Sequence, residues 1–114
     1  MKLNHINLTV TDVQAAASFL ETYFGLQSLG GNKGFMALGD DDRMVLTLMK
    51  GKRDVEVKYP ETFHIGFGQE SEAQVTALYE RLKVDGFDVA PPERSHAWTF
   101  YVVAPGGFTV EILA

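Results

Sequence analysis

The chain has 114 residues, 46% of them hydrophobic, and its 15 acidic side chains outnumber the 10 basic ones to give a formal net charge of −5. This length and composition fit a single globular α+β domain, and the acidic balance argues against nucleic acid or a membrane surface as the main partner. No apolar run approaches the roughly 18 residues of a membrane span, and the start carries no apolar signal segment. The absence of cysteine excludes disulfides, thiolate metal sites and a cysteine nucleophile, and we expect a cytoplasmic protein.

The first half of the chain predicts a strand, a helix and three more strands. Residues 5–10 alternate polar and apolar side chains, as a strand with one buried face does, and this alternation puts His5 and Asn7 on the polar face. Thr11 and Gln14 have the spacing of a capping box, which predicts that a helix begins there. Runs of β-branched and aromatic residues between glycine and aspartate clusters predict the later strands, at residues 26–29, 34–38 and 43–49.

The second half repeats this order. Residues 62–68 predict a strand with His64 on its polar face, and Ser71 and Gln74 form a second capping box. Further strands are predicted at residues 87–90, 98–103 and 108–113. The sequence therefore predicts one domain built of two βαβββ modules, residues 1–49 and 62–114, joined by a charged linker at residues 50–61.

The repeat brings distant polar residues into equivalent positions. With small drifts of the kind that loop insertions produce, His5 corresponds to His64 and Thr47 corresponds to Glu111. Two neutral imidazoles and one carboxylate form the ligand set that holds a divalent metal while leaving positions open for substrate. A lone strand histidine is usually structural or solvated, but two at equivalent positions are less easily explained in that way. Glu111 is a carboxylate in the middle of a predicted strand, which is costly unless something compensates it.

Several other residues have an ordinary explanation beside a functional one. Arg94 and His96 lie in a polar loop, where side chains are usually solvated, although a loop beside a site can also bind a substrate anion. Trp98, Tyr101 and Phe35 are aromatic strand residues, which pack in a core more often than they line a pocket. The sequence contains no phosphate-binding glycine loop and no serine nucleophile motif.

Taken together, the doubled pattern resembles the vicinal oxygen chelate superfamily of glyoxalases, bleomycin-resistance proteins and ring-cleaving dioxygenases. The resemblance covers the whole chain and rests on the doubled βαβββ unit and on the segments LNHINLTV, FHIGF and GGFTVEI. It implies two βαβββ repeats that form a curved, cupped mixed sheet with helices on the outer face. In that family the metal ligands come from the first and last strand of each unit, which here gives His5, Thr47, His64 and Glu111.

Thr47 departs from the pattern of glyoxalase I-type members, which carry a carboxylate or glutamine there. The remaining ligands, His5, His64 and Glu111, are similar to those of extradiol dioxygenases and fosfomycin-modifying transferases. The resemblance implies catalytic roles for Glu111, Tyr101 and His96. The residues that it implies for substrate binding are Asn7, Thr47, Phe35, Arg94 and Trp98.

We interpret the chain as an enzyme that uses a divalent metal ion (Fe, Mn, Zn, Ni or Co) on a small substrate with vicinal oxygens. The metal would act as a Lewis acid in a lyase or isomerase, dioxygenase or transferase reaction. One alternative is a non-enzymatic small-molecule binder of the bleomycin-resistance kind, and another is a member whose three ligands are vestigial. The resemblance also implies a homodimer in which His5 of one subunit joins His64 and Glu111 of the other, although pairing within one chain stays open.

Overall fold

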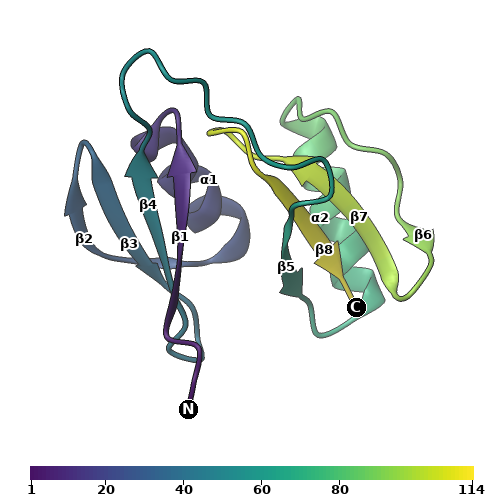
Figure 1. Ribbon diagram of the computed structural model, residues 1–114. Helices are drawn as coiled ribbons and strands as arrows, with labels where there is room; N and C mark the ends of the chain where they lie inside the picture. The colour runs from purple at the N-terminus through teal and green to yellow at the C-terminus, as the bar shows by residue number, and fades with distance from the viewer. The chain divides into compact units, whose positions relative to one another are not determined.

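The computed structural model describes residues 1–114 and divides into two compact units (Figure 1). Unit 1 consists of residues 1–59 with residues 105–107, and unit 2 consists of residues 60–104 with residues 108–114. Each unit contains one helix and one four-stranded sheet. Neither helix has the length and apolar character needed to cross a membrane.

Unit 1 has the predicted β-α-β-β-β order. Its elements are β1 (His5–Val10), α1 (Val13–Phe24), β2 (Gln27–Asn32), β3 (Phe35–Gly39) and β4 (Val45–Lys50). The sheet order is β1-β4-β3-β2, in which β1 runs parallel to β4 and the other pairs are antiparallel. Parallel strands need a long crossover connection, and here the connection from β1 to β4 contains α1, β2 and β3.

Unit 2 repeats this arrangement with one short strand. Its elements are β5 (Ile65–Gly68), α2 (Glu72–Val84), β6 (Glu93–Arg94), β7 (Trp98–Val103) and β8 (Thr109–Leu113). The sheet order is β5-β8-β7-β6, and β5 is parallel to β8. The predicted fold class, with two helices and two mixed sheets, is therefore confirmed.

The strand predicted at residues 87–90 is wrong. That segment has no regular structure, and only the two residues of β6 pair with β7. Pro91 and Pro92 explain the difference, because proline has no N–H to donate to a sheet and restricts the residue before it. The two prolines thus prevent sheet pairing in a segment whose aromatic and β-branched residues favour a strand.

The helix starts were predicted with mixed success. Ser71 caps α2 as predicted, since its side chain accepts a hydrogen bond from the Gln74 backbone N–H at 3.2 Å. The cap of α1 is Asp12 and not Thr11, because the Asp12 carboxylate accepts from the Ala15 N–H at 3.0 Å. A carboxylate at the N-cap accepts more strongly than a hydroxyl and also favours the positive end of the helix.

One face of each sheet is covered by the helix of the same unit. In unit 1 the fully buried Leu8, Leu48 and Leu20 come from β1, β4 and α1. The corresponding buried residues of unit 2 are Val110 and Ile112 of β8 with Val75 and Leu82 of α2. Because strand side chains alternate, the polar residues between these apolar ones lie on the face of the sheet away from the helix.

The turn between β7 and β8 contributes to unit 1. Residues 105–107 belong to that unit, and Gly106 has a backbone φ of +107°. A Cβ atom added to Gly106 would lie 3.0 Å from the Cβ of Val10 and 3.3 Å from the Cβ of Ala16. Both the backbone angle and the close packing therefore require glycine at this position.

Candidate functional site

Glu111 is a buried carboxylate at the centre of β8. Its residue surface is 4% exposed, and its side chain lies on the face of the sheet opposite to α2. The Thr99 hydroxyl donates a hydrogen bond to Oε2 of Glu111 at 2.7 Å, and Nε2 of His96 lies 2.7 Å from the same oxygen. Such donors offset the desolvation cost of a buried charge.

His64 precedes β5 and faces the other oxygen of this carboxylate. Its Nε2 atom lies 3.3 Å from Oε1 of Glu111, and its Nδ1 atom lies 3.0 Å from the backbone carbonyl of Thr62. A carbonyl only accepts, so Nδ1 must carry a proton, and in the neutral ring Nε2 then carries a lone pair. Two acceptors thus face each other, and a proton or a cation between them is needed to make this contact favourable.

Tyr101 lies beside both residues. It is the cross-strand partner of Glu111 in the β7–β8 pair, and its ring meets the His64 ring edge to face, with centroids 5.6 Å apart. Burial is the main cause that raises the pKa of Tyr101, and a hydrogen bond to the Glu111 carboxylate and its negative charge add to this. The hydroxyl is therefore held in its protonated form at neutral pH.

The hydrogen bonds around Glu111 decide its charge state. Burial alone would raise the pKa of Glu111, but hydrogen bonds from Thr99, His96 and Tyr101, with the charge of His96, outweigh burial, so the pKa is lowered. Glu111 is consequently an ionised carboxylate at neutral pH. An ionised carboxylate is the form that binds a metal ion.

Unit 1 presents the equivalent positions. Asn7 of β1 is paired with Thr47 of β4, just as Gly66 of β5 is paired with Glu111 of β8. The Thr47 hydroxyl donates to Oδ1 of Asn7 at 2.8 Å, so a neutral hydrogen-bonded pair occupies the place of the carboxylate. Phe35 of β3 shares this face, because the register of the sheet puts it two residues from the cross-strand partner of Thr47.

His5 is an exposed residue at the start of β1, on the same face as Asn7. Its Nδ1 atom lies 3.0 Å from the side-chain oxygen Oδ1 of Asn4. An amide oxygen is an acceptor, so this contact also places the ring proton on Nδ1 and leaves the lone pair on Nε2. His5 and His64 therefore share the tautomer that suits a ligand binding through Nε2.

Arg94 and Trp98, predicted to bind substrate, are not brought to Glu111. Arg94 forms an ion pair with Glu72 of α2 and lies over the Trp98 ring, 5.4 Å from its centroid. Trp98 donates from Nε1 to the hydroxyl of Thr76 at 3.0 Å. Both side chains thus pack on the helix side of the sheet, since Trp98 alternates in direction with Thr99 and Tyr101.

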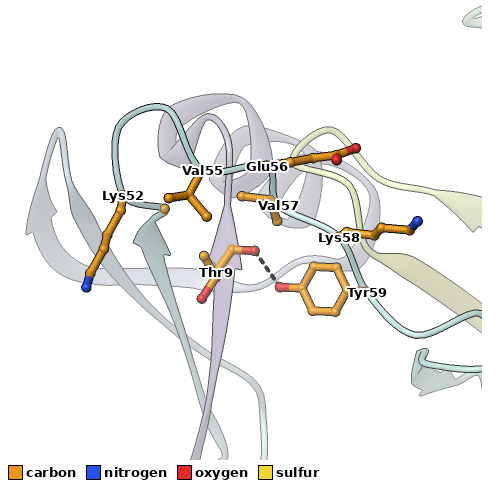
Figure 2. A pocket seen from close by; sticks show the side chains of 8 residues that line it. Thr9, Lys52, Val55, Glu56, Val57, Lys58 and Tyr59 are labelled. Atoms are coloured by element: carbon orange, nitrogen blue, oxygen red, sulfur yellow. Dashed lines mark hydrogen bonds between the residues drawn. The ribbon is translucent and has the colours of Figure 1, made fainter.

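A pocket of about 350 Å³ lies within unit 1, above the end of β1 (Figure 2). The Tyr59 hydroxyl donates a hydrogen bond to the Thr9 carbonyl on one side of it, and Val55 and Val57 lie over Thr9. Figure 2 shows Lys52 and Lys58 pointing outward on opposite sides. Thr9 has the same strand parity as His5 and Asn7, so the pocket opens on the polar face of this sheet.

The imidazole and carboxylate groups of unit 2 suit a metal ion, although neither unit by itself supplies three ligands. No three His, Asp or Glu side chains within one unit converge as metal ligands. His64 nevertheless has its Nδ1 atom held by a carbonyl, as is usual for a metal-binding histidine, and Glu111 has one oxygen held by protein donors. His64 and Glu111 thus fit two positions of a metal site, and the third predicted ligand, His5, belongs to unit 1.

Two contributors to this site were not predicted. Thr99 shares the face of Tyr101 two residues along β7, so strand alternation carried a signal that could have identified it. The Thr62 carbonyl left no trace in the sequence, because any residue type supplies a backbone carbonyl. His96 was proposed as a catalytic residue, and the structure places it against Glu111, but only the loop conformation shows this.

The doubled βαβββ architecture and the polar residues on the sheet faces away from the helices define a class of protein. The chain belongs to the Glyoxalase/Bleomycin resistance protein/Dioxygenase superfamily, whose family model matches residues 2–112. The predicted resemblance is thereby confirmed. No curated protein matches the sequence significantly.

Solved structures agree with this assignment. A structure of a possible glyoxalase from Bacillus cereus is 55% identical, with a TM-score of 0.94, and the match covers 100% of this chain and 99% of that one. Lactoylglutathione lyase from Agrobacterium tumefaciens is 19% identical, with a TM-score of 0.76 and coverage of 98% and 92%. A mutant of the fosfomycin resistance protein FosX from Listeria monocytogenes, complexed with Mn(II) and 1S,2S-dihydroxypropylphosphonic acid, is 21% identical, with a TM-score of 0.79 and coverage of 99% and 91%. The last two similarities concern the fold alone.

Proposed function

We propose that this protein is a divalent-metal-dependent enzyme acting on a small substrate that chelates the metal through two neighbouring oxygens. One observation carries the proposal: the lone pair of His64 Nε2 faces Oε1 of the ionised Glu111 at 3.3 Å, while Nδ1 is held by a carbonyl. This pair is arranged to bind a cation. His5 is the proposed third ligand, on the strength of its equivalent position and the same ring tautomer.

The superfamily supports this proposal. The FosX structure was solved with Mn(II), and a bound divalent ion would supply Lewis-acid stabilisation of a developing negative charge on substrate oxygen. Three protein ligands would leave coordination positions open for the substrate. Imidazole and carboxylate ligands suit several divalent metals, so the identity of the ion stays open among Fe, Mn, Zn, Ni and Co.

Tyr101 is the residue proposed to hold a proton at the substrate. Its hydroxyl is kept protonated by its raised pKa, its ring packs against His64, and 44% of its surface is exposed on the polar face. A protonated phenol at this place can donate a hydrogen bond to a substrate oxygen as charge develops on it, in exchange for the hydrogen bond that it gives to Glu111. Glu111 and His64 would bind the metal ion next to this hydroxyl.

A non-enzymatic small-molecule binder is the second candidate. It is favoured by the observation that every buried side-chain nitrogen and oxygen has a hydrogen-bond partner from the protein itself. No buried polar atom of such a site requires an added ion as its partner. In that function the polar sheet faces would recognise the ligand directly, and metal would make no difference to binding.

Metal analysis separates the two candidates. Protein purified in the presence of Mn(II), Fe(II), Zn(II), Ni(II) or Co(II) is desalted and its metal content measured for the wild type, Glu111→Ala and the exposed control Glu70→Ala. The proposal expects stoichiometric metal in the wild type and the control and a large loss in Glu111→Ala. Undiminished metal in Glu111→Ala would contradict the site, and a metal-free wild type that binds ligands would favour the binder.

Activity screening then addresses the reaction. Diols, adducts of 2-oxoaldehydes with thiols, and fosfomycin with a nucleophile cover the reaction classes of this superfamily. We also propose that the protein acts as a homodimer, and light scattering at micromolar concentration tests this. A mass equal to that of one chain would contradict the dimer.

A further inference from the structure

His96 lies in the tight loop between β6 and β7. The backbone N–H of Ser95 donates a hydrogen bond to the Ala97 carbonyl at 2.9 Å, which closes the loop around His96. Its Nε2 atom lies 2.7 Å from Oε2 of Glu111, and Nδ1 lies 3.4 Å from the Ser95 hydroxyl. Because a carboxylate oxygen accepts hydrogen bonds, the Nε2 atom is the donor in this contact.

The two oxygens of Glu111 have different surroundings. His96 and Thr99 both contact Oε2, whereas Oε1 faces His64. The last side-chain torsion of glutamate is broad and weakly restrained on its own, so hydrogen bonds decide how the carboxylate is rotated. The donors on Oε2, together with the hydrogen bond that Tyr101 gives the carboxylate, therefore determine where Oε1 points.

Thr99 cannot hold Oε2 alone. Its hydroxyl has a single proton, and it lies 2.7 Å from Oε2 of Glu111 and 3.0 Å from the Ile112 carbonyl. That proton is shared between two acceptors. His96 is thus the donor that is dedicated to Oε2, and its contact is charge-assisted and short.

We infer that His96 is a positioning residue that fixes the rotation of Glu111, so that Oε1 is presented to a metal ion beside His64. This inference rests on the proposed metal-dependent function. It gives His96 a positioning role in place of the catalytic role that the resemblance implies. His96 is not assigned as a ligand, because its Nε2 atom already donates to Glu111 and no three donors converge in this unit.

Metal affinity and a coordination spectrum test the inference without any substrate. Metal-free wild type, His96→Leu, His96→Gln and the control Glu93→Gln are titrated with Co(II), and both the dissociation constant and the visible absorption are recorded. Gln places an amide N–H near the position of Nε2, and Glu93 is an exposed residue of the adjacent β6. Thermal unfolding of the metal-free proteins verifies that each variant is folded.

We expect His96→Leu to bind Co(II) about 10–100-fold more weakly, the range found when a partner of a metal ligand is removed. Its visible bands should shift, because the carboxylate would bind at a different angle. His96→Gln should recover most of the affinity and the wild-type bands, and Glu93→Gln should match the wild type.

Two outcomes would overturn the positioning role of His96, and a third would overturn the metal-dependent function. Unchanged affinity and spectrum in His96→Leu would show that Glu111 does not depend on His96. Abolished binding in both His96 variants would show that His96 is itself a ligand and not a positioning residue. A wild type that takes up no Co(II) would instead overturn the proposed metal-dependent function.

Discussion

Nε2 of His64 and Oε1 of Glu111 lie 3.3 Å apart, although the neutral imidazole presents a lone pair here and the ionised carboxylate is an acceptor too. The Thr62 carbonyl imposes this situation, because it occupies the Nδ1 proton of the ring. A similar ring tautomer in His5 follows from its contact with Asn4. The Thr62 carbonyl and the Asn4 amide oxygen thus leave the Nε2 lone pair of both imidazoles available for binding.

The tautomer of His64 can be measured directly. We expect that ¹⁵N chemical shifts of the metal-free protein, recorded at about pH 8.5 where an ordinary imidazole is neutral, show the His64 proton on Nδ1. His96 should instead show its proton on Nε2, since that atom donates to Glu111. Finding the His64 proton on Nε2 would contradict the proposed orientation of the lone pair.

Glu111 should contribute stability that depends on pH. Its pKa in the folded state is lowered from the ordinary 4.5, so its ionised form stabilises the fold above that value, and the contribution is lost as the pH falls through the lower folded value. We expect Glu111→Gln to lower the free energy of unfolding by about 1–3 kcal/mol at pH 7, because the donors around it lose a charged acceptor.

Urea denaturation of the metal-free proteins between pH 7 and pH 3 measures this contribution. The difference between the wild type and Glu111→Gln should shrink toward the acid end. A difference that stays constant down to pH 3 would show that Glu111 is not the titrating group.

Tyr59 should affect stability at the alkaline end. Burial is the main cause that raises its pKa above the ordinary 10.0. A raised folded pKa means that the contribution is fully present below pH 10 and is lost as the pH rises through the folded value. Tyr59→Phe should therefore cost about 1 kcal/mol at pH 7. The cost should diminish above pH 10, and equal stability of the two proteins at pH 7 would contradict the hydrogen bond.

Gly106 offers a test of packing in unit 1. Gly106→Ala introduces a Cβ atom 3.0 Å from Val10 at a backbone angle that alanine rarely adopts, and we expect it to cost about 1–3 kcal/mol. Gly68→Ala is the matched control, because no atom lies within 4 Å of its Cβ position and its φ is not positive. The control should change stability by less than about 0.5 kcal/mol in chemical denaturation. Equal effects of the two substitutions would contradict the described turn.

The order of elements could be predicted from the sequence because residues 5–10 alternate regularly and residues 98–103 form a run of β-branched and aromatic residues. The alternation also placed His5 and Glu111 on the faces away from the helices, as the structure has them. The strand at residues 87–90 failed because strand propensity was weighed without the effect of Pro91 and Pro92 on sheet pairing.

The surroundings of the carboxylate were less accessible to sequence analysis. Thr11 and Asp12 are adjacent residues that can each cap a helix, and only the backbone angles of the structure select Asp12. Likewise, the contact of His96 with Glu111 depends on a loop whose conformation leaves no periodic signal. The metal-binding roles of His5, His64 and Glu111 stay predictions until metal content is measured.

The turn that carries Gly106 makes unit 1 discontinuous along the chain. Val10 and Ala16 precede most of unit 2 in the sequence, but the glycine that packs against them follows most of that unit. Closing so long a loop has an entropic cost that local contacts cannot offset in advance. On a ribosome, residues 1–59 would therefore emerge with part of their core uncovered and would complete their packing only after the hairpin of β7 and β8 had formed.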